Sequence, residues 1–133
     1  MLIKTFCAAV NGLEVTTVTI EVSITRGVQF HLTGLGDEAV RESRDRIAAA
    51  MQYNGFKFPI ADITVNMAPA DLKKECSSFD LPLAIGILAA NENMTADRLN
   101  DYTLAGELSP CSYTHLTPPT IYIVHNSVVA VIL

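Results

Sequence analysis

Cysteines and basic residues are scarce in this chain of 133 residues, and each scarcity argues against particular classes of binding site. Cys7, Cys76 and Cys111 are scattered, odd in number and without Cys-x-x-Cys or Cys/His spacing, which argues against a disulfide framework and against a zinc site. Nine basic side chains against fourteen acidic ones give a net charge of −5. Because phosphate neutralisation needs clustered Lys and Arg, we do not expect a generic nucleic-acid-binding surface.

The chain also has little that would direct it to a membrane. Its first residues show no charged segment followed by a long apolar one, so no secretory signal is expected. Residues 121–133 are apolar, but they are shorter than the roughly 18 to 20 residues of a spanning helix, and His125 and Asn126 interrupt them. Together with cysteines that fit a reducing compartment, this predicts a cytoplasmic protein without a membrane segment.

A phosphate-binding motif is missing as well. The pattern Gly-x-x-x-x-Gly-Lys-Ser/Thr does not occur, so the sequence shows no means of binding ATP. Gly34-Leu35-Gly36 lacks the third glycine of a dinucleotide loop, and Asp37-Glu38 would place carboxylates where a phosphate should lie. A tight turn between a strand and a helix is the better interpretation, and we predict no cofactor and no metal for these residues.

Hydrophobic residues make up 50% of the chain, which suits one packed domain. The pattern predicts strands at 2–10, 15–25 and 29–33, with turns at Asn11-Gly12 and Arg26-Gly27 that favour a meander. Residues 37–53 read as a helix with one apolar face, formed by Val40, Ile47 and Met51, and one charged face with weak local ion pairs such as Glu42 with Arg46. The predicted order is βββαβαβ, an α+β fold of two layers.

The segment from Ile63 to Leu88 carries the most information. Ile63, Val65 and Met67 alternate with polar residues, as in a half-buried strand. Ser77-x-x-Asp80 before an apolar run is typical of a helix start, where a hydroxyl and a carboxylate accept hydrogen bonds from free backbone N–H groups. The helix that follows has no polar face. It should therefore lie against the sheet and need further protein on its far side, part of which an isolated domain would leave exposed.

Three segments carry a resemblance to a known family. The run TVNMAPADLKKECSSFDLPLAIGILAA resembles TVNLAPADLRKEGSxFDLPIALGILAA, GLGDEAVRESR at 34–44 resembles GLPDxAVRESR, and LAGELS at 104–109 resembles FLGELS. These are motifs of the N-terminal domain of the Mg-chelatase-like AAA+ ATPases of the ComM/YifB type. The resemblance covers residues 1–109, and the chain departs from it at Gly36, at Cys76 and after Ser109.

This resemblance implies a fold and a biological setting. The fold would be the ribosomal-S5 domain 2-like fold shared with the Lon protease domain. In the family an AAA+ module follows in the same polypeptide, binds ATP and magnesium, and forms homo-hexamers associated with branch migration of DNA during natural competence. It follows that residues 1–109 are an accessory, non-catalytic domain whose partners are that module, further copies and, through the whole protein, DNA.

The Lon-like fold also implies candidate catalytic residues. When Lys74-Glu75-Cys76 is laid on the Lys-Asp-Gly of Lon-type proteases, Ser77 or Ser78 lies near the place of the nucleophile. A serine needs a base, in that family a lysine further along the chain, and no lysine follows Lys74. Helix capping explains both serines without catalysis. A Lon-like serine peptidase domain and a stand-alone interaction module remain the alternative functions.

Two further features complete the sequence-based hypotheses. Arg41, Arg44, Lys73 and Lys74 could form a basic edge for DNA or a neighbouring domain, although a solvated charge run is the simpler explanation. Residues 111–133 contain no Asp, Glu, Lys or Arg, and SYTHLTPPTIY resembles a translated sequencing adapter. We therefore expect residues 110–133 to be a non-native tail, with an added edge strand as the alternative.

Overall fold

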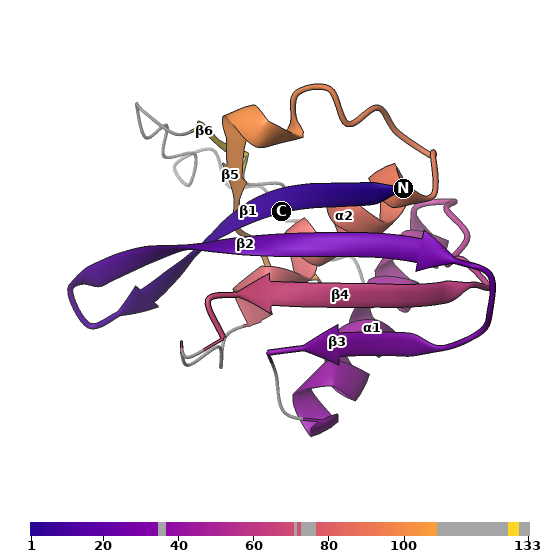
Figure 1. The fold of residues 1–133 in the computed structure, drawn as a ribbon, viewed down its shortest axis with the longest axis horizontal. Helices are drawn as coiled ribbons and strands as arrows, with labels where there is room; N and C mark the ends of the chain where they lie inside the picture. Colours follow the sequence, from indigo (N-terminus) through magenta and orange to yellow (C-terminus); the bar gives the residue numbers. More distant parts are fainter. Residues whose placement is uncertain (35–36, 71, 73–76, 109–127, 131–133) are drawn as a thin grey trace.

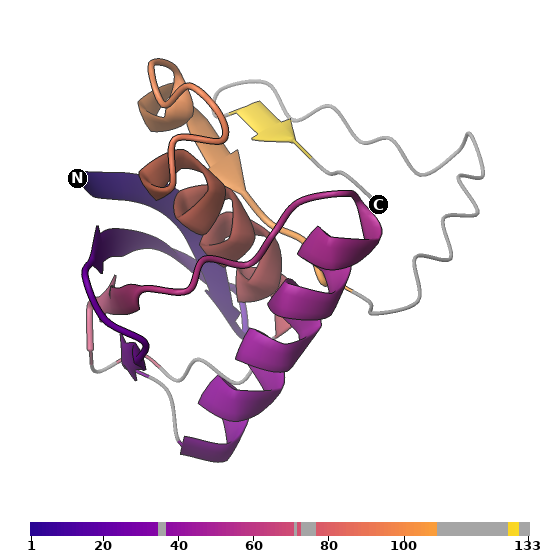
Figure 2. The ribbon, with the colours of Figure 1, turned by 90° about the vertical axis from the view of Figure 1, so that its right-hand side faces the viewer.

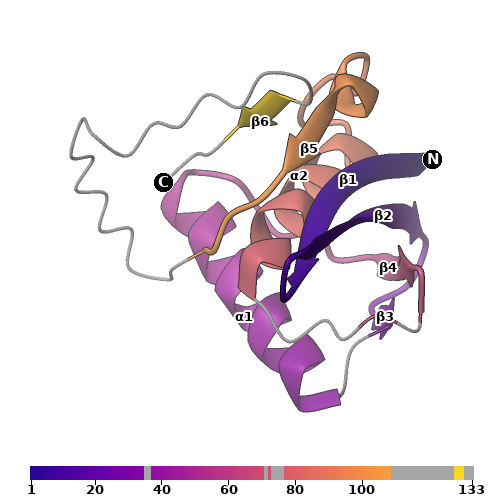
Figure 3. The same cartoon turned by 90° about the vertical axis from the view of Figure 1, so that its left-hand side faces the viewer.

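A computed structural model describes residues 1–34, 37–70, 72, 77–108 and 128–130 of the chain. It is a two-layer α+β structure in which the two described α-helices cover the same face of one mixed sheet (Figures 2 and 3). The strands are β1 (Leu2–Asn11), β2 (Glu14–Thr25), β3 (Phe30–Thr33), β4 (Asp62–Ala68), β5 (Tyr102–Leu104) and β6 (Val128–Ala130). The helices are α1 (Asp37–Tyr53) and α2 (Asp80–Ala90), with 3-10 turns η1 (Ser77–Phe79) and η2 (Leu99–Asp101).

The order of elements predicted from the sequence is confirmed as far as β5, but the predicted meander is wrong. β6 pairs with β5 at the edge of the sheet, as in the alternative of an added edge strand within residues 110–133. The strands lie in the order β3-β4-β2-β1-β5-β6 (Figure 1), so β4 separates β2 from β3. β1 and β2 form an antiparallel hairpin through Gly12, whose φ of 63° suits the turn. β3 instead runs parallel to β4, with α1 as the connection between them. Parallel strands need a crossover connection of this kind. On its other side, β4 pairs antiparallel with β2 along the whole length of β4.

Alternation along the strands creates an apolar inner face and a polar outer face. The inner side chains of the three central strands are buried beneath the helices: Ile3, Cys7, Val18, Ile20, Val22, Ile63, Val65 and Met67. On the outer face, Lys4 Nζ lies 2.9 Å from Glu21 Oε1, and the Asn66 side-chain amide donates to Glu21 Oε2. These hydrogen bonds, Lys4 first, lower the pKa of Glu21. One face of the sheet is therefore core and the other is solvated.

Helix α2 lies against β1 and β2, as its apolar sequence predicts. The expectation that an isolated domain would expose part of it is wrong, because every residue of α2 except Ile85 is buried. Helix α1 packs beside α2 and buries Ile47 and Met51, as predicted; the side chain of Val40 lies outside the described residues. Two contacts fix α2 on the sheet: the Thr5 hydroxyl donates to the Pro82 carbonyl at 3.1 Å, and Gly86 faces Val22.

Candidate functional site

The start of α2 carries a buried ionic network that joins the two helices. The Asp80 carboxylate accepts hydrogen bonds from Arg46 Nε at 2.6 Å, from Arg46 Nη2 at 3.2 Å and from the Ser43 hydroxyl at 2.8 Å. The Asp80 side chain is 2% exposed and that of Arg46 is 27% exposed. The hydrogen bond from Arg46 to Asp80 raises the pKa of the guanidinium. These hydrogen bonds tie α1 to the first turn of α2.

One prediction about these residues is wrong, and another is confirmed but incomplete. Asp80 does not cap α2, since its carboxylate is occupied by Ser43 and Arg46, and the N-cap residue Phe79 makes no side-chain cap bond. The predicted pair of Arg46 with Glu42 is confirmed, since Arg46 Nη1 lies 3.7 Å from the largely exposed Glu42 carboxylate. Arg46 also binds the buried Asp80, which the local spacing does not indicate. One feature of the sequence could have indicated this network. Ser43, Arg46 and Ile47 are three and four residues apart, so a helix places the two polar side chains near the same face as the buried Ile47.

The segment after β5 supplies the bond that the cap was expected to make. The Gly106 carbonyl accepts from the Leu81 backbone N–H at 3.1 Å, and the Gly106 N–H donates to the Ser78 carbonyl at 3.0 Å. A side chain at position 106 would meet Leu81, whose Cδ2 would lie 2.9 Å from the new Cβ. The glycine of the LAGELS motif therefore allows the chain to approach the helix start closely.

Ser78, the described candidate nucleophile, lies in η1 and is partly buried. Its backbone carbonyl is held by Gly106. Among the described residues, no lysine or histidine is hydrogen-bonded to its hydroxyl, and Lys4, one of the described lysines, is paired with Glu21 on the outer face. The side chain of Ser77 and all of residues 73–76, including Cys76, lie outside the described part. The described neighbourhood of Ser78 thus contains a helix start and shows no Ser–base pair.

Half of the predicted basic edge can be placed. Arg41 and Arg44 are exposed on α1, three residues apart, whereas Lys73 and Lys74 lie outside the described residues. Arg44 stacks over the Phe58 ring, with Cζ 5.6 Å from the ring centroid, and its Nη1 lies 3.6 Å from Asp45. No local pattern indicates this stacking, because Phe58 lies fourteen positions further on, beyond the end of α1.

The stacked pair forms one wall of a small cavity. Its volume is about 140 Å³, and it is lined by Val28, Gln29, Phe30, Arg44, Phe58, Pro59, Ile60, Ala61 and Ile63. The C-terminus of α1 shapes this region: Phe56 N–H donates to Met51 and Gly55 N–H to Gln52, and Gly55 has a φ of 82°. This Schellman-type ending turns the chain away from the helix axis, so that Phe58 returns beneath Arg44.

The described residues offer neither a metal centre nor a membrane span. No group of three His, Cys, Asp or Glu side chains among them could hold a metal ion. In the same part of the chain, no helix is both long enough and apolar enough to cross a membrane. His31 is exposed, and its Nε2 is hydrogen-bonded to the Gln29 side chain at 2.8 Å.

Comparison with known proteins agrees with the motifs. The family model of subunit ChlI of Mg-chelatase matches residues 20–120. The chain belongs to this family. The YifB protein of Escherichia coli K12 is 43% identical over 102 residues, which are 76% of this chain and 20% of that protein. Competence protein ComM of Haemophilus influenzae is 44% identical over 105 residues, 78% of this chain and 21% of ComM.

The relatives are much longer than the matched region. A protein of Mycobacterium tuberculosis H37Rv is 42% identical over 107 residues, again 21% of its length. The chain therefore spans about a fifth of the length of the curated relatives it matches. For YifB and ComM the matched part is the N-terminal region. The resemblance inferred from the motifs is thus confirmed for the Mg-chelatase-like family and for its ComM and YifB members.

Proposed function

We propose that residues 1–109 act as an accessory, non-catalytic N-terminal domain of a Mg-chelatase-like AAA+ ATPase that processes DNA, by branch migration during natural competence. The observation that carries this proposal is the 44% identity to the N-terminal region of a protein named for competence. In the proposed whole protein, a following AAA+ module binds ATP and magnesium, forms a homo-hexamer in the cytoplasm and moves DNA. Residues 110–133 are proposed to be foreign to this domain.

The architecture supports an accessory role in assembly or control. Asp80, Arg46 and Ser43 lock the two helices together, and Gly106 closes the start of α2, so the domain is a firmly connected unit. Two helices on one face of a sheet, in the order βββαβα, also support the proposed S5 domain 2-like fold. A domain whose elements are held together in this way is suited to pass a change of conformation between neighbouring domains or copies, which supports an accessory role more than a catalytic one.

The test replaces the matched region of ComM from H. influenzae. Three proteins are compared: native ComM, ComM without the matched region, and ComM with residues 1–109 of this chain in its place. We expect all three to bind ATP, the deletion to lose normal assembly or its response to DNA, and the replacement to recover both. Unchanged movement of DNA junctions in the deletion would remove this domain from the mechanism and favour a stand-alone interaction module.

The peptidase alternative makes a separate prediction about the serines. A Lon-like peptidase would be labelled by a serine-directed fluorophosphonate, and Ser77→Ala or Ser78→Ala would abolish the labelling. We expect no labelling of the native chain above that of the Ser77→Ala/Ser78→Ala double variant, because a serine without a base is a weak nucleophile. Intact-mass spectrometry provides the readout. Stoichiometric labelling that depends on one of the two serines would contradict the non-catalytic assignment.

A further inference from the structure

Two exposed apolar clusters lie at opposite ends of strand β2. The first is the tip of the β1–β2 hairpin, where Val10, Leu13 and Val15 are exposed beside Glu14; we call it the tip. The second surrounds the small cavity behind β3, where Val28 and Ile60 are exposed beside Arg44; we call it the pocket end. Figure 1 shows the hairpin projecting at one end of the sheet and the β2–β3 connection at the other.

The tip has the form of an arm. Pairing of β1 with β2 continues to Asn11 and Glu14, whereas β4 pairs with β2 only from Thr19 onward. On the other side, the described pairing of β5 with β1 is at Phe6. The last turn of the hairpin therefore extends past its neighbours. Val10 and Val15 are direct partners in the ladder, so both point to one face of the arm, and Leu13 is fully exposed at the turn.

The pocket end has the form of a receptor for one apolar side chain. Its cavity of about 140 Å³ is well below the roughly 300 to 1,000 Å³ typical of small-molecule sites. Seven of its nine lining residues are apolar, polar atoms share the lining surface with them, and the exposed guanidinium of Arg44 is stacked at its wall. Arginine and aromatic side chains around a desolvated pocket are typical of the centre of a protein–protein interface.

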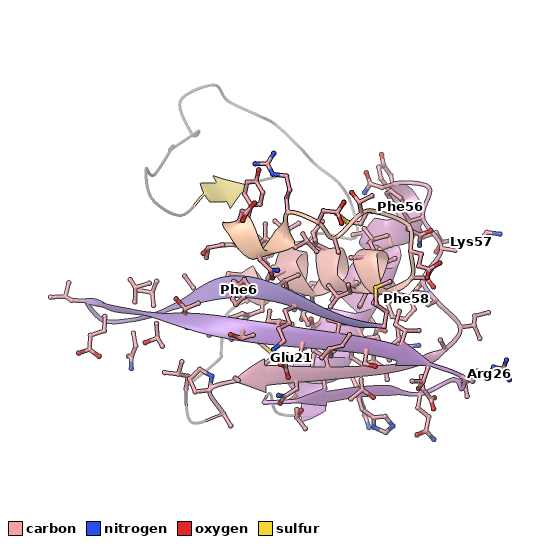
Figure 4. All side chains as sticks on the ribbon, turned by 45° about the horizontal axis from the view of Figure 1, so that its top comes forward. Phe6, Glu21, Arg26, Phe56, Lys57 and Phe58 are labelled. Atoms are coloured by element: carbon pink, nitrogen blue, oxygen red, sulfur yellow. The ribbon has the colours of Figure 1, made fainter. Side chains whose placement is uncertain are left out.

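Charge at the pocket end favours an incoming carboxylate. Arg26 and Lys57 lie at the same end as Phe56 and Phe58 (Figure 4) and join Arg44 as cations. Two carboxylates face this region. Asp45 lies 3.6 Å from Arg44 and is largely exposed, and Asp62 Oδ1 is occupied by the Gln29 backbone N–H at 2.7 Å. Among the described residues, three cations thus lie with two anions at this end, in a chain whose net charge is −5.

We propose that the tip of one copy of this chain docks into the pocket end of a second copy, with Leu13 entering the cavity and Glu14 facing Arg44. The chain carries both halves of the contact: an apolar residue next to an acid on the arm, and an apolar cavity next to a base at the far end. Because the two surfaces differ, the contact is head-to-tail, the kind that builds rings or filaments. This inference rests on the assembly role proposed above, and it names a second copy of the chain as the partner in that assembly.

The test mixes two variants of the 133-residue chain in sedimentation velocity experiments. Leu13→Ser removes the tip residue and leaves the pocket end intact, while Ile60→Asp disables the pocket end and leaves the tip intact. The native chain should associate increasingly with concentration, and each variant alone should associate at least tenfold more weakly. An equimolar mixture should form a dimer that grows no further, because the one remaining tip and the one remaining pocket end satisfy each other.

Two controls distinguish this contact from nonspecific association and from misfolding. Leu2→Ser changes another exposed apolar residue, on β1, which β2 separates from the strands beside the cavity, and should leave association unchanged. Equal melting temperatures of all variants establish that folding is intact. A native chain that stays monomeric, a mixture that stays monomeric, or a mixture that grows past the dimer would each overturn the proposal. None of these outcomes bears on the junction assay with ComM, so the two proposals fail independently.

Discussion

Replacing Arg46 by Met should lower the free energy of unfolding of this chain by about 3 kcal/mol, because among the described residues it leaves the buried Asp80 carboxylate with only the Ser43 hydroxyl as a partner. Breaking a fully buried ion pair from one side costs about 3 to 5 kcal/mol. We expect the lower end because the Arg46 side chain is 27% exposed and the site can admit water. Urea denaturation followed by circular dichroism measures the effect.

The matched control is Glu42→Gln, which removes the other carboxylate beside Arg46. That pair is 3.7 Å long and largely exposed, so its loss should change stability by about 0.5 kcal/mol or less. A double variant, Arg46→Met with Asp80→Leu, should recover much of the lost stability, since no unpaired charge is then buried. Equal effects of Arg46→Met and Glu42→Gln would show that the network does not hold the helices together.

The second large effect concerns Gly86, in the middle of α2. In an exposed helix, Gly→Ala is stabilising by about 1 kcal/mol. Here the added methyl would lie 2.7 Å from Val22 Cγ2, and Val22 is fully buried and stiff about χ1. Overpacking of this kind costs about 1 to 3 kcal/mol. We therefore expect Gly86→Ala to destabilise the chain by about 1 kcal/mol, the middle of the range of about 0 to 2 kcal/mol that these two contributions leave.

A change of sign tests the cause of this effect. In a Val22→Ala background the obstructing methyl is absent, and Gly86→Ala should then become stabilising, as in an ordinary helix. Thermal and urea unfolding of the four proteins in this cycle give the interaction energy directly. A stabilising effect of Gly86→Ala in the native background would mean that α2 lies further from β2 than the structure shows.

Local patterns in the sequence are sufficient to predict where the helices and strands lie, but not which of them pack against one another. The helix predicted at 37–53 has the bounds that the structure gives, and alternation of Ile63, Val65 and Met67 places β4. The position of β4 between β2 and β3 cannot be predicted from such patterns. Strand pairing depends on which distant segments compete for an edge, and not on the turn at Gly27 alone. The burial of every residue of α2 but Ile85 is not indicated by local patterns for a similar reason: the elements that cover α2 are distant in sequence.

The candidate site shows the same division. The sequence identifies the Ser77–Asp80 segment as important but assigns Asp80 to its own helix, since a local cap is the simplest use of an acid at a helix start. Its actual partners, Ser43 and Arg46, lie more than thirty positions earlier. Likewise, helical spacing pairs Arg46 with Glu42 because Glu42 lies one turn away. Local rules predict local partners, and the network that joins the two helices is not local.

The most direct test of the proposed function is the rate at which DNA junctions move when ComM carries residues 1–109 of this chain in place of its own matched region. If these residues form an accessory domain of that ATPase family, deletion of the region should abolish or slow junction movement while ATP binding persists, and the replacement should restore it. Junction movement at the native rate in the deletion would contradict the account, whatever the replacement does.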